Sequence, residues 1–310
     1  MINQELSTQN IDIREDNLLK KDYLLELLLQ DKTTGNNILW ATNSYEQNGK
    51  KYAPCAPITS DLVTGKNGKV IQPRAVKSKE EQLLRTRDKA EVFTPLSIVK
   101  QMNDACDTML VTKNNWQEYL ALRKLEITCG EAPYIVSRYD PVSDKQGLLP
   151  LKKRVGFLDR KLSVVSKYCE DHEDWLKWAF IAFKSSYGYE WQGDNLLIAR
   201  ENLIYTFIDN YEAKFKETPS SNLQKEIAEI IIWNIFQMDG LKYVIPMSCK
   251  NEKITIIGQD TLFGKEDDRI VEKECEGCSN KIAQNHNGTY VKIMDWTKGQ
   301  TIRFADLIGK

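Results

Sequence analysis

The sequence predicts an α/β fold built around a largely parallel sheet. Three short apolar segments have the length and composition of strands, and they lie at residues 124–128, 186–191 and 234–246. Predicted helices separate these segments, and this alternation is typical of βαβ units whose strands run parallel. A helical N-terminal region and a small β-rich C-terminal appendage complete the predicted architecture.

The chain has 310 residues, which is enough for one large domain with appendages or for two domains. We divide it into an N-terminal region of helical and irregular structure (residues 1–85), a core (86–246) and a β-rich tail (247–310). The tail begins where the character of the sequence changes. Two strand-like segments, KITIIG and YVKIMDW, flank a charged stretch there.

The first helices are predicted from their apolar positions and their end signals. Residues 17–30 carry leucines on more than one face, which predicts a helix that is buried or packs on a partner. Residues 31–77 are rich in turns, and residues 78–92 predict an exposed, charged helix. Thr94 suits the N-cap of the next helix and Pro95 suits its first position.

The core is predicted to contain several more helices. One continues the first strand, two fill the interval before the second strand, and a long amphipathic helix and a shorter one follow. Their ranges are 132–139, 151–168, 172–186, 193–215 and 220–233. About sixty residues separate the first two strands, which exceeds one helix with short loops and implies a helical insertion.

The overall charge does not favour binding of nucleic acid over the whole surface. Lys and Arg number 43 and Asp and Glu number 44, so the two signs nearly cancel. Local basic clusters remain candidates for phosphate contacts. One comprises Arg85, Arg87 and Lys89, and another comprises Lys152, Lys153 and Arg154 and extends to Arg160 and Lys161. Each cluster could equally be a solvated helix face.

The sequence predicts a cytoplasmic protein that does not enter a membrane. The segment MINQELSTQNIDIRED lacks the apolar region of a signal peptide, and apolar stretches such as IAEIIIWNIF are too short to span a bilayer. The seven cysteines are an odd number without disulfide-scaffold spacing, which indicates reduced thiols.

Acidic residues follow each predicted strand, where α/β folds bind their ligands. Glu126 and Glu131 flank Cys129 and Gly130 after the first strand, and Glu190 ends the second. The third strand is followed by MDG, which contains Asp239. The chain contains neither GxGxxG nor GxxxxGK[ST], so the usual phosphate-binding loops are absent from the sequence.

Four segments resemble motifs of adenine-specific DNA methyltransferases from restriction–modification systems. AEVFTPLSIVKQMND resembles their F-T-P segment, and LEITCGEAPY resembles their first cofactor motif. YGYEWQGDNLLIARENL and NIFQMDGL are similar to the motifs that follow their second and third strands. The resemblance spans roughly residues 80 to 245. It implies a Rossmann-like methyltransferase core, S-adenosylmethionine as cofactor, DNA as partner, and a role in restriction–modification or a related defence system.

The resemblance also implies roles for individual residues around the cofactor. Glu190 would accept hydrogen bonds from the ribose hydroxyls. The turn at Cys129 and Gly130 would let the backbone approach the methionine moiety closely. Glu126 or Glu131 would meet the ammonium group.

Two further segments complete the implied cofactor site. Phe93, Thr94 and Pro95 would lie against the amino-acid end of the cofactor. Asp239 would accept from the exocyclic amine of its adenine.

One motif of the family is missing. Members that methylate adenine carry Asn/Asp-Pro-Pro-Tyr/Phe, whose acceptors orient the target amine while its aromatic ring stacks on the flipped base. This chain contains no Pro-Pro pair, and Ala132 and Pro133 replace the second glycine of the first motif. We therefore assign no catalytic residue.

Three interpretations follow from the missing motif. The chain could be an active methyltransferase whose catalytic loop is atypical or lies on a protein partner. It could bind cofactor or nucleic acid without transferring a methyl group. It could also be a scaffold in a defence complex that docks through its leucine-rich N-terminal helix.

The tail contains a candidate structural zinc site. Cys275 and Cys278 form a C-x-x-C knuckle, and His286 follows at short range. Cys249 lies 26 residues upstream of Cys275 and could be the fourth ligand. The alternative is a pair of reduced surface thiols.

Overall fold

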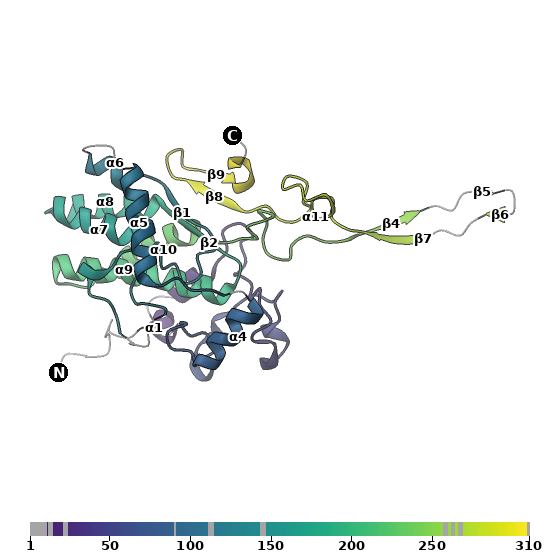
Figure 1. The fold of residues 1–310 in the computed structure, drawn as a ribbon, viewed down its shortest axis with the longest axis horizontal. Coiled ribbons are helices and arrows are strands. Elements are labelled where there is room, and N and C mark those ends of the chain that lie inside the picture. Colours follow the sequence, from purple (N-terminus) through teal and green to yellow (C-terminus); the bar gives the residue numbers. More distant parts are fainter. Residues whose placement is uncertain are drawn as a thin grey trace.

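The protein has a mixed helical and β architecture with a small parallel sheet, seen in a computed structural model (Figure 1). The structure describes residues 11, 15–20, 24–89, 91–110, 115–142, 147–256, 260–261, 264–265 and 269–308.

More of the described residues lie in helices than in strands. They are α1 (Glu15–Lys20), α2 (Leu24–Leu29), α3 (Ser60–Val63), α4 (Lys79–Lys89), α5 (Leu96–Leu110), α6 (Trp116–Ala121), α7 (Phe157–Tyr168), α8 (His172–Lys184), α9 (Gly193–Phe215), α10 (Ser221–Asn234) and α11 (Glu276–Asn280). The strands are β1 (Lys124–Glu126), β2 (Ser186–Glu190), β3 (Ile235–Gln237), β4 (Glu252–Ile256), β5 (Asp260–Thr261), β6 (Gly264–Lys265), β7 (Arg269–Lys273), β8 (Lys292–Asp295) and β9 (Gln300–Arg303).

The three strands predicted in the core form one sheet in the order β1-β2-β3, and both pairings are parallel. The α/β class and the parallel sheet are therefore confirmed. Glu126 pairs with Gly188, and Glu190 pairs with Gln237. Paired residues on neighbouring strands point to the same face of a sheet, and so do residues two apart on one strand, so these four residues share one face. The carboxyl ends of the three parallel strands lie at one edge of the sheet.

Different layers cover the two faces of the sheet. One face belongs to the main apolar core, where Ile235 packs with side chains of α7, α8, α9 and α10. On the other face, Tyr189 and Phe236 pack with Ile293 of β8 and with Phe304. Both faces are thereby buried, as expected of parallel strands.

The N-terminal region packs onto this core. Trp40 is fully buried in the same apolar cluster as α9 and α10, and α2 contacts both of those helices. The N–H of Gly193 donates to the carbonyl of Trp40 at 2.9 Å. A Cβ at Gly193 would lie 2.0 Å from the carbonyl oxygen of Leu39, so this close approach requires glycine. The boundary at residue 85 stays a prediction.

The predicted range of the longest helix, α9, is confirmed, but its predicted amphipathic character is wrong. Almost all of α9 is buried, because the N-terminal region covers the side that would otherwise face solvent. Arg200, which is fully buried, donates to the carbonyls of Ile235, Leu28 and Gln30. Polar side chains on α9 therefore serve as internal hydrogen-bond donors.

The helix predicted at residues 132–139 is also wrong, since this segment is a series of turns. Ala132 has a left-handed φ of 64°, which does not continue a helix. The carbonyls of Tyr134 and Ile135 accept from the first N–H groups of α7, at 2.8 and 2.9 Å. The turns thus cap α7, which begins at Phe157 and not near residue 151 as predicted.

Lys161 is the subject of a testable prediction. Its ammonium is fully buried and donates to the Leu122 carbonyl at 2.7 Å and to Ser185 Oγ at 2.6 Å. Burial lowers the pKa of Lys161 to about 7. Between a pH of about 7 and the ordinary pKa of 10.5, the Lys161 amine is therefore more protonated in the unfolded chain than in the folded one. Compared with Lys161→Met, the wild type should gain stability as pH rises through this window, by at most about 1.4 kcal/mol per pH unit.

Denaturant unfolding at several pH values measures this difference. If the free energies of unfolding of the two proteins change with pH in the same way across this window, the prediction is wrong.

The C-terminal region contains three separate antiparallel pairs, β4 with β7, β5 with β6, and β8 with β9. The strands predicted in KITIIG and YVKIMDW are confirmed within the described residues. The β4–β7 pair extends away from the body as an arm (Figure 1). Its described side chains are exposed, so the arm is anchored only at its base.

Candidate cofactor cavity and candidate metal centre

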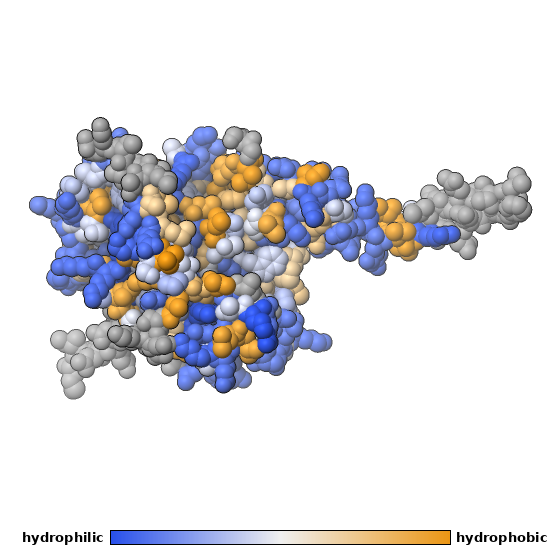
Figure 2. Space-filling view, viewed as in Figure 1, coloured by the Kyte–Doolittle hydropathy of each residue, from blue (hydrophilic) through white to orange (hydrophobic). Residues whose placement is uncertain are grey.

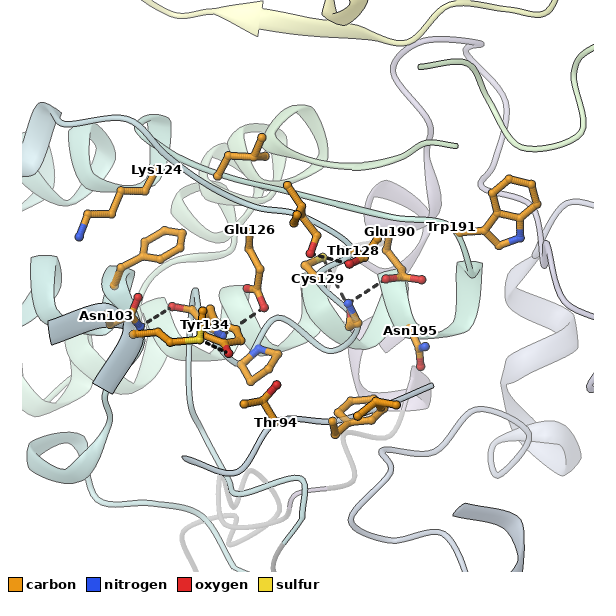
Figure 3. A pocket seen from close by; sticks show the side chains of 18 of the residues that line it. Thr94, Asn103, Lys124, Glu126, Thr128, Cys129, Tyr134, Glu190, Trp191 and Asn195 are labelled. Atoms are coloured by element: carbon orange, nitrogen blue, oxygen red, sulfur yellow. Dashed lines mark hydrogen bonds between the residues drawn. The ribbon is translucent and has the colours of Figure 1, made fainter. Parts of the chain in front are cut away.

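A cavity of about 860 Å³ opens at the carboxyl ends of β1 and β2. Its wall combines the segment before α5, one side of α5, the turn after β1 and the start of α9 (Figure 3). Six of the nine predicted cofactor contacts line it: Phe93, Thr94, Glu126, Cys129, Gly130 and Glu190. The structure therefore brings together residues that lie almost a hundred positions apart.

The turn after β1 has unusual backbone geometry. Thr128, Gly130 and Ala132 all have left-handed φ values, of 46°, 53° and 64°. Such conformations cost free energy in residues other than glycine and persist where the surroundings hold them. The N–H of Cys129 donates to the carbonyl of Tyr189 at 2.8 Å, which ties the turn to β2.

Glu190 is the last residue of β2, and its carboxylate holds the turn after β1 in place. Its carboxylate accepts from the N–H of Gly130 at 2.8 Å and from the N–H of Gln192 at 3.1 Å. Burial raises the pKa of Glu190, while these two N–H donors oppose the shift. Each carboxylate oxygen still has lone-pair capacity for a donor in the cavity.

Glu126 forms a second buried acid in the wall. It accepts from the N–H groups of Tyr134 at 3.3 Å and Ile135 at 3.0 Å. Burial raises its pKa well above the ordinary value, and the nearby Glu190 raises it further. Burial also raises the pKa of the Cys129 thiol, so this cysteine is not an activated nucleophile.

Two polar residues at the start of α9, Gln192 and Asn195, line the cavity although the sequence did not mark them as site residues. Asn195 donates to Glu91 at 2.7 Å, but its Oδ1 atom is buried without a hydrogen-bond partner. The Oε1 atom of Gln192 is also buried and unpartnered. Both residues line the cavity, and Asn195 lies near Glu190 in Figure 3. The signal was present in the segment QGDNLL, whose polar residues precede an apolar helix.

Three predicted cofactor contacts do not line the cavity: Pro95, Glu131 and Asp239. Glu131 is buried elsewhere, where it accepts from the N–H of Arg74 at 2.6 Å and the hydroxyl of Tyr139 at 2.7 Å. Of the two acids considered for the ammonium, the structure thus places only Glu126 in the wall. Asp239 accepts from the N–H of Leu241 and closes its own turn.

The basic clusters differ in what they offer to a phosphate. Lys152 and Lys153 are exposed on a single 3-10 turn. The Arg154 side chain is only 4% exposed and pairs with Asp209 at 2.6 Å, so the expected surface role of this residue is corrected to an internal ion pair. Arg85 is likewise buried in an ion pair, with Glu91, whereas Arg87 is exposed.

The four residues of the predicted metal site come together at the base of the arm. The Sγ atoms of Cys249, Cys275 and Cys278 lie 3.6, 3.7 and 3.6 Å from Nδ1 of His286. All four ligand atoms lie within 4.8 Å of one another. A tetrahedral zinc with the usual Zn–S and Zn–N bond lengths requires an S···N separation of about 3.6 Å. The cluster could therefore hold a metal ion and is compatible with zinc.

The backbone around this cluster is shaped to bring the ligands together. A Cβ at Gly277 would lie 2.6 Å from the backbone nitrogen of His286, and one at Gly288 would lie 3.0 Å from Cys249 Sγ. The N–H of Asn287 points to Cys275 Sγ at 3.2 Å, a contact that stabilises a thiolate. Glycine at both positions is thus a requirement of the knuckle.

Comparisons of the chain with protein-family models, with curated proteins and with solved structures found no match. Among the described helices, none combines the length and the apolar character that crossing a bilayer requires.

Proposed function

We propose that the cavity binds S-adenosylmethionine and that the chain is a DNA adenine methyltransferase-like protein of a restriction–modification or related defence system. The observation that carries the proposal is the pair of carboxylates in the cavity wall, Glu126 at the end of β1 and Glu190 at the end of β2. Carboxylate oxygens have lone pairs to spare for a ligand rich in N–H and O–H donors.

The chemistry of the cofactor fits these groups. S-adenosylmethionine carries an ammonium, two ribose hydroxyls, an adenine amine and a sulfonium charge. Glu190 at the end of β2 is suited to the ribose hydroxyls, and Glu126 to a cationic group. Phe93 and Thr94 close the cavity from the side of α5. On this proposal the sheet is the cofactor-binding part of a Rossmann-like core, and the bound cofactor supplies the methyl group.

The proposal includes DNA as the partner and zinc as the ion at the base of the arm. Lys152 and Lys153 are the exposed cations offered for phosphate contacts. A second candidate function, cofactor or nucleic-acid binding without methyl transfer, is favoured by one specific observation. The sequence contains no Pro-Pro pair, so the family motif that holds the target amine is missing from this sequence.

Binding of S-adenosylmethionine to Glu190→Gln tests the cavity assignment. We expect affinity to fall roughly tenfold to a hundredfold, because hydrogen bonds to a charged group contribute about 1.5–3 kcal/mol. Isothermal titration measures it. Glu173→Gln, a change at an exposed glutamate in the first turn of α8, is the matched control and should bind as the wild type does.

The affinity should also rise as pH increases from the ordinary Glu value of 4.5, because the cationic ligand favours the ionised form of two acids whose pKa values burial has raised. Equal affinity of wild type and Glu190→Gln, with no pH dependence, would remove the assignment.

Transfer of a tritiated methyl group to unmodified DNA separates the two candidate functions. The protein is assayed alone and with an extract of its native host. Incorporation supports the enzyme, whereas cofactor binding without incorporation in either assay supports the non-catalytic subunit.

A further inference from the structure

The loop that carries His286 also carries a side chain that reaches across the candidate metal centre. Asn287 follows His286 directly, in the segment between α11 and β8. The four candidate ligands come from three stretches of chain: Cys249 before β4, the C-x-x-C knuckle around the start of α11, and His286. Cys249 and His286 lie 37 positions apart, so contacts between their two stretches must bring them together.

The side-chain amide of Asn287 makes such a contact. Its Oδ1 atom accepts from the N–H of Lys250 at 3.1 Å, and its Nδ2 atom donates to the carbonyl of Lys250 at 2.8 Å. One amide thereby holds both backbone groups of a single residue, as a neighbouring strand would. Because Lys250 directly follows Cys249, this pairing fixes the stretch that carries Cys249 against the stretch that carries His286.

Two further contacts of Asn287 reach the knuckle and the arm. Its backbone N–H donates to Cys275 Sγ at 3.2 Å, and its Nδ2 atom also donates to Oε1 of Glu252 at 3.3 Å. Glu252 is the first residue of β4. Figure 2 shows the arm as a thin extension that stands clear of the body. Its orientation therefore depends on the contacts that hold its base.

We infer that Asn287 is a positioning residue of the metal centre, which holds the ligands at the separation that zinc requires and joins the centre to the arm. Its amide is engaged by Lys250 and Glu252, so it acts through the ligands and not as one of them. Groups that orient metal ligands typically change metal affinity by roughly tenfold to a hundredfold. The inference rests on the zinc assignment made in the proposed function.

The loop around His286 is closed by a different residue. The hydroxyl of Tyr290 accepts from the N–H of His286 at 2.9 Å and donates to the carbonyl of Ala283 at 2.8 Å. Neither bond involves the side chain of Asn287. Removal of the Asn287 amide should therefore leave this loop folded and release the stretch that carries Cys249.

Two variants of the full-length protein test the role of the amide. Asn287→Asp keeps the size of the side chain, removes the Nδ2 donor and sets a carboxylate against the Lys250 carbonyl and the Glu252 carboxylate. Asn287→Ala removes the amide without adding charge. Asn285→Asp is the matched control, because it adds the same charge two residues away, where the amide donates to Glu276 at 3.4 Å. Competition with a chromophoric chelator measures the zinc affinity of each protein.

We expect both Asn287 variants to bind zinc roughly tenfold to a hundredfold more weakly than the wild type, and Asn285→Asp to bind it as the wild type does. At saturating cobalt(II), the Asn287 variants should keep the absorption of a tetrahedral thiolate site, because all four ligands remain. With zinc bound, amide exchange in β4 should be faster in these variants than in the wild type, while the α9 amides stay protected.

Three results would overturn the inference and leave the zinc assignment standing. They are equal zinc affinity of Asn287→Asp and Asn285→Asp, loss of the tetrahedral cobalt absorption at saturation in both Asn287 variants, and loss of α9 protection in both, which would show general unfolding. A wild-type protein that binds no zinc would overturn the zinc assignment together with the inference. The two failures are therefore distinguishable.

Discussion

The purified protein should contain one zinc ion per chain, and Cys278→Ser should remove it. Three thiolates and one imidazole form a complete ligand set, and loss of one ligand leaves a site that binds zinc far more weakly. Metal analysis after dialysis measures the content. Cys55→Ser is the matched control, because Cys55 is exposed and outside the cluster, and it should keep its metal.

Removal of the metal should also loosen the arm. The β4–β7 pair is two strands wide, and an isolated two-stranded pair is marginally stable at best. Cys249 precedes β4, and Cys275 follows β7, so the metal would join the two strands at their base. Amide exchange in residues 252–256 and 269–273 should accelerate after chelation, while the α9 amides stay protected. Full exchange protection of the arm without metal, a wild-type protein without zinc, or a Cys278→Ser protein with as much zinc as Cys55→Ser would contradict the assignment.

Arg85→Met should destabilise the fold by about 3–5 kcal/mol. The guanidinium is 5% exposed and pairs with Glu91 at 2.7 Å and Asp194 at 2.6 Å. Its removal takes the ion-pair partner from the buried Asp194 and leaves Glu91 with only the longer pair to Arg74, at 3.9 Å. Denaturant unfolding measures the loss. Arg87→Met is the matched control on the same helix, because Arg87 is 73% exposed and pairs with Asp88 at the surface. That change should cost no more than about 1 kcal/mol.

The pH dependence gives an independent check of this ion pair. Burial alone would raise the pKa of Asp194, but Arg85 and other partners lower it below the ordinary 3.8. The stabilisation is therefore present above that pH and is lost as pH falls through the lowered value. The difference between wild type and Arg85→Met should shrink in acid. Equal stability losses for Arg85→Met and Arg87→Met at neutral pH would disprove the buried network.

The same residues show which parts of the site could be read from sequence. The parallel strand segments and the C-x-x-C knuckle were predictable, because both depend on residue type at short spacing. Cys249 and His286 could be proposed as ligands, but only the folded tail brings them within reach of the knuckle. Arg85 and Arg154 could not be told from surface cations, since the carboxylates of Asp194 and Asp209 that pair with them lie far away in the chain.

The acids at the strand ends illustrate the same division. Residue type and position predicted four acids as cofactor contacts: Glu126, Glu131, Glu190 and Asp239. Of these, only Glu126 and Glu190 line the cavity. The turn geometry after β1 directs Glu131 towards Arg74 and Tyr139. The polar segment QGDNLL contains Asn195, but that its Oδ1 atom is buried without a partner follows only from the packing of the surrounding elements.

The sequence by itself determined the α/β class, the three strand segments of the parallel sheet and the C-x-x-C knuckle, because these follow from local periodicity and spacing. The tertiary structure alone decided which charges are buried and which acids line the cavity. Those properties depend on contacts between segments that are distant in the chain. No local pattern encodes them, because burial and pairing belong to the packed arrangement and not to single segments.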